Sequence, residues 1–134
     1  MKSERQLGGC LCGAIRYEIS GPLRSVLNCH CGMCRRFHGH FGAYTSVSRA
    51  NLRFCGSSEP HWYQSSDSAR RGFCSICGAS LFWQRKDSGE ISIAAGSLDK
   101  PTGLNTAGHI FTAHKGDYYD IEDQAPRWPG SPSD

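Results

Sequence analysis

The chain has 134 residues, of which 38% are hydrophobic and 20% are charged, and its formal net charge at pH 7 is +3. This length predicts a single domain, and the small net charge argues against a disordered chain. No stretch approaches the roughly 20 apolar residues of a membrane span, and the charged and polar residues at the start of the sequence do not resemble a secretory signal peptide.

The first predicted element is a pair of cysteines followed by a strand. Cys10 and Cys12 lie between glycines, and glycine lets the backbone turn tightly around a small group. From residue 14 to residue 19 apolar and polar side chains alternate, with Ile15, Tyr17 and Ile19 on one face. This alternation is typical of a half-buried strand.

A second cysteine group follows the first strand. Cys29, Cys31 and Cys34 fall within six residues, and His38 and His40 come shortly after them. No window of 11 or more residues has a helical period, whereas short runs separated by turn residues are typical of strands. Besides 14–19, we expect strands at residues 41–47, 52–54, 62–64, 81–84 and 91–95. The predicted fold class is therefore all-β.

The third cysteine group and the end of the chain complete the predicted organisation. Cys74 and Cys77 stand directly before the predicted strand at 81–84. The last residues, 127–134, are rich in proline, glycine and serine, which predicts a flexible tail. We therefore expect one domain over residues 1–126 and a flexible segment over residues 127–134.

The eight cysteines favour metal binding over disulfides. The spacings C-x-C, C-x-C-x-x-C and C-x-x-C are those of metal-binding turns, and a disulfide framework would need an extracellular context. Metal-held thiolates predict a reducing compartment and a cytoplasmic protein. Seven thiolates and two Zn²⁺ would bring the formal charge from +3 to zero, which makes a nucleic-acid partner unlikely.

The three groups divide into two predicted zinc sites. Cys10 and Cys12 with Cys74 and Cys77 would complete a closed, four-ligand site, whereas Cys29, Cys31 and Cys34 would leave one position open. The alternative is that both sites are structural, the second being closed by a fourth protein ligand. Cys55 stands alone, and we expect it to be a buried, free, weakly hydrophobic residue rather than that ligand.

The histidines near the triplet have several possible roles. His38 and His40 could support the ligands by hydrogen bonds, carry a proton, or supply a fourth ligand; each could equally be a partly exposed polar residue. His30 lies inside the triplet, where neighbouring side chains cannot all face one ion. No carboxylate lies close in sequence to the triplet as a general base. An ion held by three thiolates is weakly electrophilic, which favours presenting a bound thiolate over activating water.

The motifs together resemble those of the glutathione-dependent formaldehyde-activating enzyme family, also called the centromere protein V/GFA domain. The resemblance spans about residues 8–126, and the order and spacing of seven cysteines make it specific. His38 and His40 stand where many members carry smaller residues. The matching segments are Gly9-Cys10-Leu11-Cys12-Gly13, Cys29-His30-Cys31-Gly32-Met33-Cys34-Arg35-Arg36, Phe73-Cys74-Ser75-Ile76-Cys77-Gly78, Gly96-Ser97-Leu98-Asp99, His109-Ile110-Phe111 and Tyr118-Tyr119-Asp120.

The resemblance implies a mostly antiparallel, tent-like β fold with a structural zinc at the two cysteine pairs and a catalytic-type zinc at the triplet. It further implies a carbon–sulfur lyase that reversibly joins a thiol such as glutathione to formaldehyde or another small aldehyde. His38 and His40 are the predicted catalytic residues, as proton carriers. A second function class stays open: a non-catalytic zinc module that binds protein or nucleic acid, whose mark would be a contiguous basic or apolar face.

Overall fold

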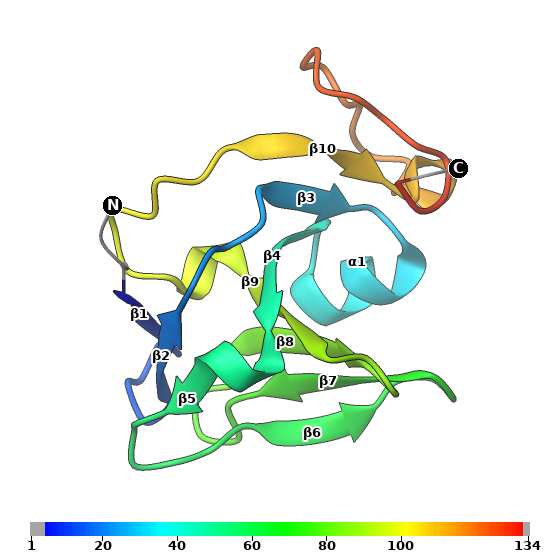
Figure 1. Cartoon of the computed structure of the whole chain (residues 1–134). Helices are drawn as coiled ribbons and strands as arrows, with labels where there is room; N and C mark the ends of the chain where they lie inside the picture. Colours follow the sequence, from blue (N-terminus) through cyan, green and yellow to red (C-terminus); the bar gives the residue numbers. More distant parts are fainter. Residues whose placement is uncertain (1–4, 133–134) are drawn as a thin grey trace.

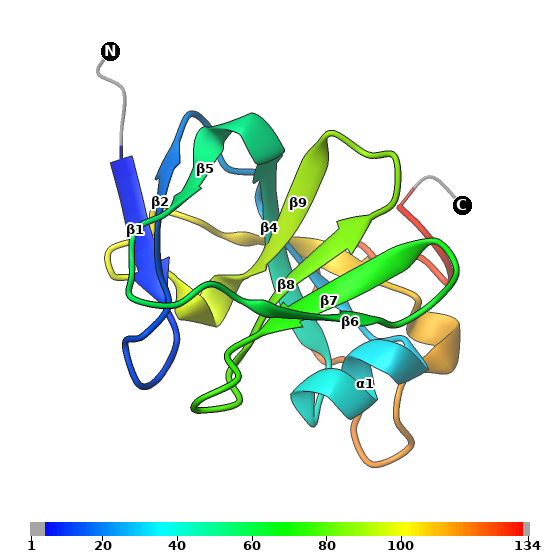
Figure 2. The same ribbon diagram turned by 90° about the horizontal axis from the view of Figure 1, so that it is seen from below.

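The structure is a computed structural model of the chain, and it describes residues 5–132. Within that range ten strands form two sheets, with one α-helix beside them (Figures 1 and 2). None of the helices in this range is long and apolar enough to span a bilayer. The elements are β1 (Arg5–Gly9), β2 (Arg16–Ser20), β3 (Val26–Cys29), α1 (Gly32–His38), β4 (Gly42–Ser48), β5 (Leu52–Phe54), β6 (His61–Gln64), β7 (Ala69–Phe73), β8 (Ser80–Arg85), β9 (Glu90–Ala94) and β10 (Thr106–Ile110).

The strands pair almost entirely antiparallel, as predicted. One sheet has the order β1-β2-β5, and the larger one has the order β10-β3-β4-β9-β8-β7-β6. The exception is β10, which pairs parallel to β3. The three-stranded sheet and α1 lie at opposite ends of the molecule in both views (Figures 1 and 2). The prediction of a mostly β, single-domain fold is confirmed.

The main apolar core lies between the two sheets. Ile15, Tyr17 and Ile19 are all fully buried, as the alternation in the sequence predicts, and they contribute to one cluster with residues of β4, β8 and β9. The ring of Tyr17 packs edge-on against Phe82, with 5.5 Å between the ring centroids. Its hydroxyl lies 2.5 Å from the Ser97 Oγ, so the one polar atom that Tyr17 brings into the core has a partner.

Five elements of the structure were not expected from the sequence: β1, β3, β7, β10 and α1. The helix has seven residues, fewer than the window in which a helical period can be recognised. It begins after Cys31, whose side chain accepts a hydrogen bond from the Cys34 N–H, and it ends at Gly39, whose φ of 82° suits a residue without a Cβ. The four strands lack a clean alternation of apolar and polar residues, because β3 is buried throughout and β1, β7 and β10 each contain glycine.

The predicted tail makes backbone hydrogen bonds along its described part, residues 127–132. The Trp128 N–H donates to the His109 carbonyl (2.9 Å), and the Phe111 N–H donates to the Gly130 carbonyl (2.9 Å). The indole of Trp128 covers Gly108, where a Cβ would come within 2.6 Å of the ring. Residues 133 and 134 lie outside the described range. The boundary at residue 126 stays a prediction, but the chain just beyond it packs along β10.

We expect Gly8→Ala to destabilise the fold. A Cβ at Gly8 would lie 2.4 Å from the ring of the buried Tyr17 and 2.6 Å from the Ser97 carbonyl oxygen, so β1 would have to move away from Tyr17 on its neighbour β2 and from the segment that carries Ser97. Overpacking of this kind costs about 1–3 kcal/mol, measurable as a lower midpoint in denaturant. Gly89→Ala is the control, because nothing lies within 4 Å of a Cβ there. Equal stability of the two variants would contradict the close packing of β1 on β2.

Candidate metal centres

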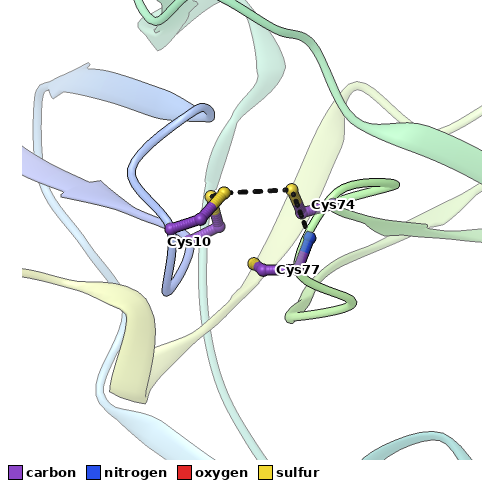
Figure 3. A group of neighbouring side chains, drawn as sticks. Cys10, Cys74 and Cys77 are labelled. Atoms are coloured by element: carbon purple, nitrogen blue, oxygen red, sulfur yellow. Dashed lines mark hydrogen bonds between the residues drawn. The ribbon is translucent and has the colours of Figure 1, made fainter.

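Four cysteines from two distant turns converge on one point. Cys10 and Cys12 lie between β1 and β2, and Cys74 and Cys77 lie in the turn between β7 and β8. Their sulfur atoms all lie within 4.8 Å of one another, and no disulfide joins them. Figure 3 shows the side chains of Cys10, Cys74 and Cys77 pointing toward a common centre. The four thiols could hold a zinc ion, as we expect from the grouping of the two cysteine pairs into one site.

Backbone N–H groups donate hydrogen bonds to the sulfur atoms of this cluster. The Ile15 N–H donates to the Cys10 Sγ at 3.2 Å, and the Cys77 N–H donates to the Cys74 Sγ at 3.4 Å. A hydrogen bond from the Ala79 N–H is the first cause that lowers the pKa of Cys77 to about 6. Metal ligands must be deprotonated, so the local backbone fits a cluster that binds a cation.

The second cluster is formed by Cys29, Cys31 and Cys34, whose sulfur atoms also lie within 4.8 Å of one another. Cys29 ends β3, Cys31 caps α1, and Cys34 lies in its first turn. Hydrogen bonds with the other two thiols, followed by burial, raise the pKa of Cys29, whereas the hydrogen bond from Cys29 lowers the pKa of Cys31. Three adjacent thiolates need a cation among them, so this donor set also fits zinc.

No fourth potential ligand joins this triplet among residues 5–132. The group of His, Cys, Asp and Glu ligand atoms within 4.8 Å of one another contains the three sulfurs and nothing else. Cys55 belongs to neither cluster, and it is exposed, so the expectation that it is buried was wrong. Phe54 turns its ring toward Phe82 in the core, and the following residue in the chain therefore faces outward.

A buried arginine lies beside the triplet. Arg71 of β7 is only 4% exposed, and its Nη1 and Nη2 each lie 3.6 Å from the Cys34 Sγ. Its Nη1 also lies 3.4 Å from the Tyr44 hydroxyl. No role for Arg71 at the triplet was expected from the sequence. The pair of adjacent arginines, Arg70 and Arg71, is the sequence feature that could have indicated it. Adjacent residues of a strand face opposite sides of the sheet. Arg70 lies over the Trp62 ring at 3.9 Å, and Arg71 points inward.

The two predicted catalytic histidines are not ligands of the triplet in this arrangement. The Nε2 of His38 lies 2.5 Å from the Tyr44 hydroxyl, which links His38 to Cys34 through Tyr44 and Arg71. Burial, followed by the charge of Arg71, lowers the pKa of His38 to about 4. The Nδ1 of His40 lies 2.6 Å from the Tyr118 hydroxyl.

A third histidine, His30, is itself buried and belongs to a chain of hydrogen-bonded side chains. Its Nδ1 lies 2.5 Å from the Tyr119 hydroxyl and its Nε2 lies 2.9 Å from the Nδ1 of His109. His109 in turn contacts the carboxylate of Asp123 at 3.0 Å. Burial is the first cause that lowers the pKa of His30 to about 4. The residues next to His109 in the sequence indicate no role for it, because its partners His30 and Asp123 lie 79 and 14 positions away in the chain.

A cavity of about 370 Å³ opens beside the triplet. All three cysteines of the triplet line it, together with Arg24, Tyr44, Arg71, four serines and a set of apolar side chains. The apolar set comprises Leu27, Met33, Ala69, Trp83, Ile110 and Phe111.

A second hollow, of about 590 Å³, adjoins the cavity. It shares Met33, Ser65 and Arg71 with the cavity and adds Arg35 and Arg36. One space beside the sulfurs is therefore mainly apolar, and its neighbour is basic.

Two comparisons with known proteins agree with this architecture. The family model described as "Glutathione-dependent formaldehyde-activating enzyme" matches residues 5–114. A crystal structure of a protein from Rhodobacter sphaeroides is similar with a TM-score of 0.61 at 23% sequence identity, over 75% of this chain and 97% of that one. At this identity the likeness shows the fold alone.

We expect Cys77→Ser to remove the ion of the four-cysteine site and the cooperative unfolding transition with it. A structural zinc contributes about 10–16 kcal/mol in apparent terms, comparable with the whole stability of a domain. Metal analysis and thermal unfolding test this, and Cys55→Ser is the control because Cys55 lies in neither cluster. A cooperatively folded Cys77→Ser protein that still holds two zinc ions would refute the assignment.

Cys31→Ala should have a milder effect. The triplet lies beside α1, at the far end of the molecule from the three-stranded sheet (Figure 2), and the main core does not include its cysteines. We expect a folded protein with one zinc ion, measured by metal analysis and circular dichroism. Retention of two ions would show that another residue replaces Cys31.

Proposed function

Because the chain belongs to the glutathione-dependent formaldehyde-activating enzyme family, we propose that it is a carbon–sulfur lyase. It would reversibly join a thiol such as glutathione to formaldehyde or another small aldehyde. The observation that carries this proposal is the cysteine triplet, which has no fourth ligand within residues 5–132 and lines a cavity. Such an arrangement leaves room for a substrate sulfur beside the three protein sulfurs.

The seven clustered cysteines have two proposed tasks. Cys10, Cys12, Cys74 and Cys77 would hold a structural zinc ion. Cys29, Cys31 and Cys34 would hold a catalytic-type ion, whose charge, when it is bound, would keep a substrate thiol in its thiolate form at neutral pH. The need to keep these thiols reduced is the reason for proposing a cytoplasmic location.

The proposed reaction makes one bond and moves one proton. The thiolate sulfur attacks the carbonyl carbon, a C–S bond forms, and the π pair of the C=O bond moves to oxygen, which takes a proton to become a hydroxyl group. The reverse reaction breaks the C–S bond and returns the proton. Nothing is oxidised or reduced.

Tyr44 and His38 are proposed to handle that proton. The Tyr44 side chain lines the cavity, and its hydroxyl is hydrogen-bonded to His38 Nε2. Burial raises the pKa of Tyr44, so the hydroxyl keeps its proton and can donate a hydrogen bond to a carbonyl oxygen. With its proton on Nε2, His38 would donate to the Tyr44 oxygen and leave the tyrosine O–H free for the carbonyl oxygen. His40, hydrogen-bonded to Tyr118, is the second proposed proton carrier.

Three arginines would supply positive charge. Zn²⁺ with three thiolates carries a net charge of −1, and the buried guanidinium of Arg71 beside Cys34 offsets it. N–H···S contacts of this kind reduce the negative charge that a thiolate would donate to a bound ion. The ion would then bind a fourth, anionic sulfur more readily. Arg35 and Arg36 line the adjoining hollow, where they would pair with the carboxylates of glutathione.

We expect glutathione to bind the zinc-loaded protein with release of close to one proton at pH 7. A free thiol has a pKa of about 8.5, which must fall when the thiol becomes a thiolate ligand. Calorimetry in buffers of different ionisation enthalpy measures the proton count. Affinity should fall as the pH is lowered, because protons compete for the sulfur.

S-methylglutathione is the matched control, since it keeps the peptide but cannot form a thiolate. It should bind at least about tenfold more weakly, a difference of 1.4 kcal/mol. Equal affinity for the two peptides without proton release would remove the thiol-capture mechanism. The non-catalytic zinc module would then be the better proposal.

A further inference from the structure

The cavity beside the triplet is larger than a formaldehyde adduct requires. Beyond the sulfur, a hydroxymethyl group has only one carbon and one oxygen atom. The cavity has a volume of about 370 Å³, within the range of roughly 300–1,000 Å³ that is usual for ligand sites. A formaldehyde adduct would therefore leave most of this space to water. Most of the wall of that space is apolar and is formed by side chains that include Leu27, Met33, Trp83, Ile110 and Phe111, while four serines also line it.

The charges at the cavity do not suit a tripeptide. Glutathione carries two carboxylates and an ammonium group, and burial of an unpaired charge is costly. The charged side chains that line the cavity are Arg24 and Arg71, and no carboxylate of the described chain lines it. Arg24 already donates to the Tyr44 carbonyl at 2.9 Å, and Arg71 contacts Cys34 and Tyr44.

The adjoining hollow suits the peptide better. It contains Arg35 and Arg36, and the Nε of Arg35 is buried and has no hydrogen-bond partner among the described residues. The two spaces meet at Met33, Ser65 and Arg71. A thiol whose peptide lies in the basic hollow would therefore leave the apolar cavity free for the group that its sulfur attacks.

We propose that this cavity takes an apolar side chain of the aldehyde, so that the substrate is the thiol adduct of a cyclic or branched apolar aldehyde rather than of formaldehyde. This inference rests on the proposed function, in which the substrate sulfur lies at the triplet. The bonds made and broken are those already described: the C–S bond forms, the C=O π pair moves to oxygen, and the oxygen takes the proton.

Binding can be tested without turnover, through Trp83 in the cavity wall. Cyclohexylmethanol has the expected shape, cannot react with a thiol, and does not absorb where tryptophan does. We expect it to change the tryptophan fluorescence of the zinc-loaded protein in a saturable way. The change should persist in Trp62→Phe, because Trp62 packs on Arg70 and Phe82 instead, and disappear in Trp83→Phe. A wild-type protein whose fluorescence does not respond would overturn the inference.

Substrate preference is tested by filling the cavity. Ser92 of β9 lines it, whereas Ser48 is exposed at the end of β4. We measure kcat/KM with glutathione for cyclohexanecarbaldehyde and for formaldehyde, and take the ratio. In Ser92→Leu the ratio should fall at least about tenfold, a change typical of a pocket that loses space for a few carbons. In Ser48→Leu it should not change. Metal content and thermal unfolding report whether each variant is folded.

A second filling variant keeps the test decisive if Ser92→Leu does not fold. Met33 lines the same cavity and is 51% exposed. Met33→Trp should therefore narrow the cavity without adding volume to the buried core. A wild-type preference for formaldehyde, or an equal loss with both aldehydes in the filled variants, would overturn the inference and leave the proposed lyase intact. Turnover of neither aldehyde would instead remove the proposed function, and this inference with it.

Discussion

The convergence of four cysteines is the constraint on which the rest of the structure depends. It joins the turn after β1 to the turn after β7 and thereby ties the small sheet to the large one. The tie is part of the core itself, because Cys74 is 1% exposed and packs in the same cluster as Ile15 and Leu81. A metal ion bound by this cluster would fix the two sheets to each other, because the free energy of metal binding adds directly to the free energy of folding.

The negative charge of the second cluster is compensated by one buried side chain. Three thiols lie together in a mostly buried place, and a buried anion needs compensation. Arg71 provides it from β7, a strand that is distant from the triplet in sequence. The same guanidinium reaches Tyr44, which holds His38. Charge balance and proton handling at the proposed site are thus linked through a single residue.

The C-terminal part of the chain shapes the cavity. The buried His30 and His109 form a chain of hydrogen bonds with Asp123 at the surface, and this chain fixes β10 and the following loop against β3. Phe111, which lines the cavity, adopts a φ of 53°, uncommon for a residue other than glycine. Its N–H is held by the Gly130 carbonyl. Residues beyond the first hundred therefore complete a site whose sulfurs come from residues 29–34.

The sequence by itself determined the features that are encoded locally. The cysteine spacings predicted both clusters, because each spacing already brings two or three thiols toward one point. Strict alternation at residues 14–19 predicted the buried face of β2, because side chains on a strand alternate between its two sides. Tertiary structure decided the burial of Arg71, the exposure of Cys55, the partners of His30 and the cavity beside the triplet. Each of these depends on which distant segments pack together, and no local pattern of residues encodes that pairing.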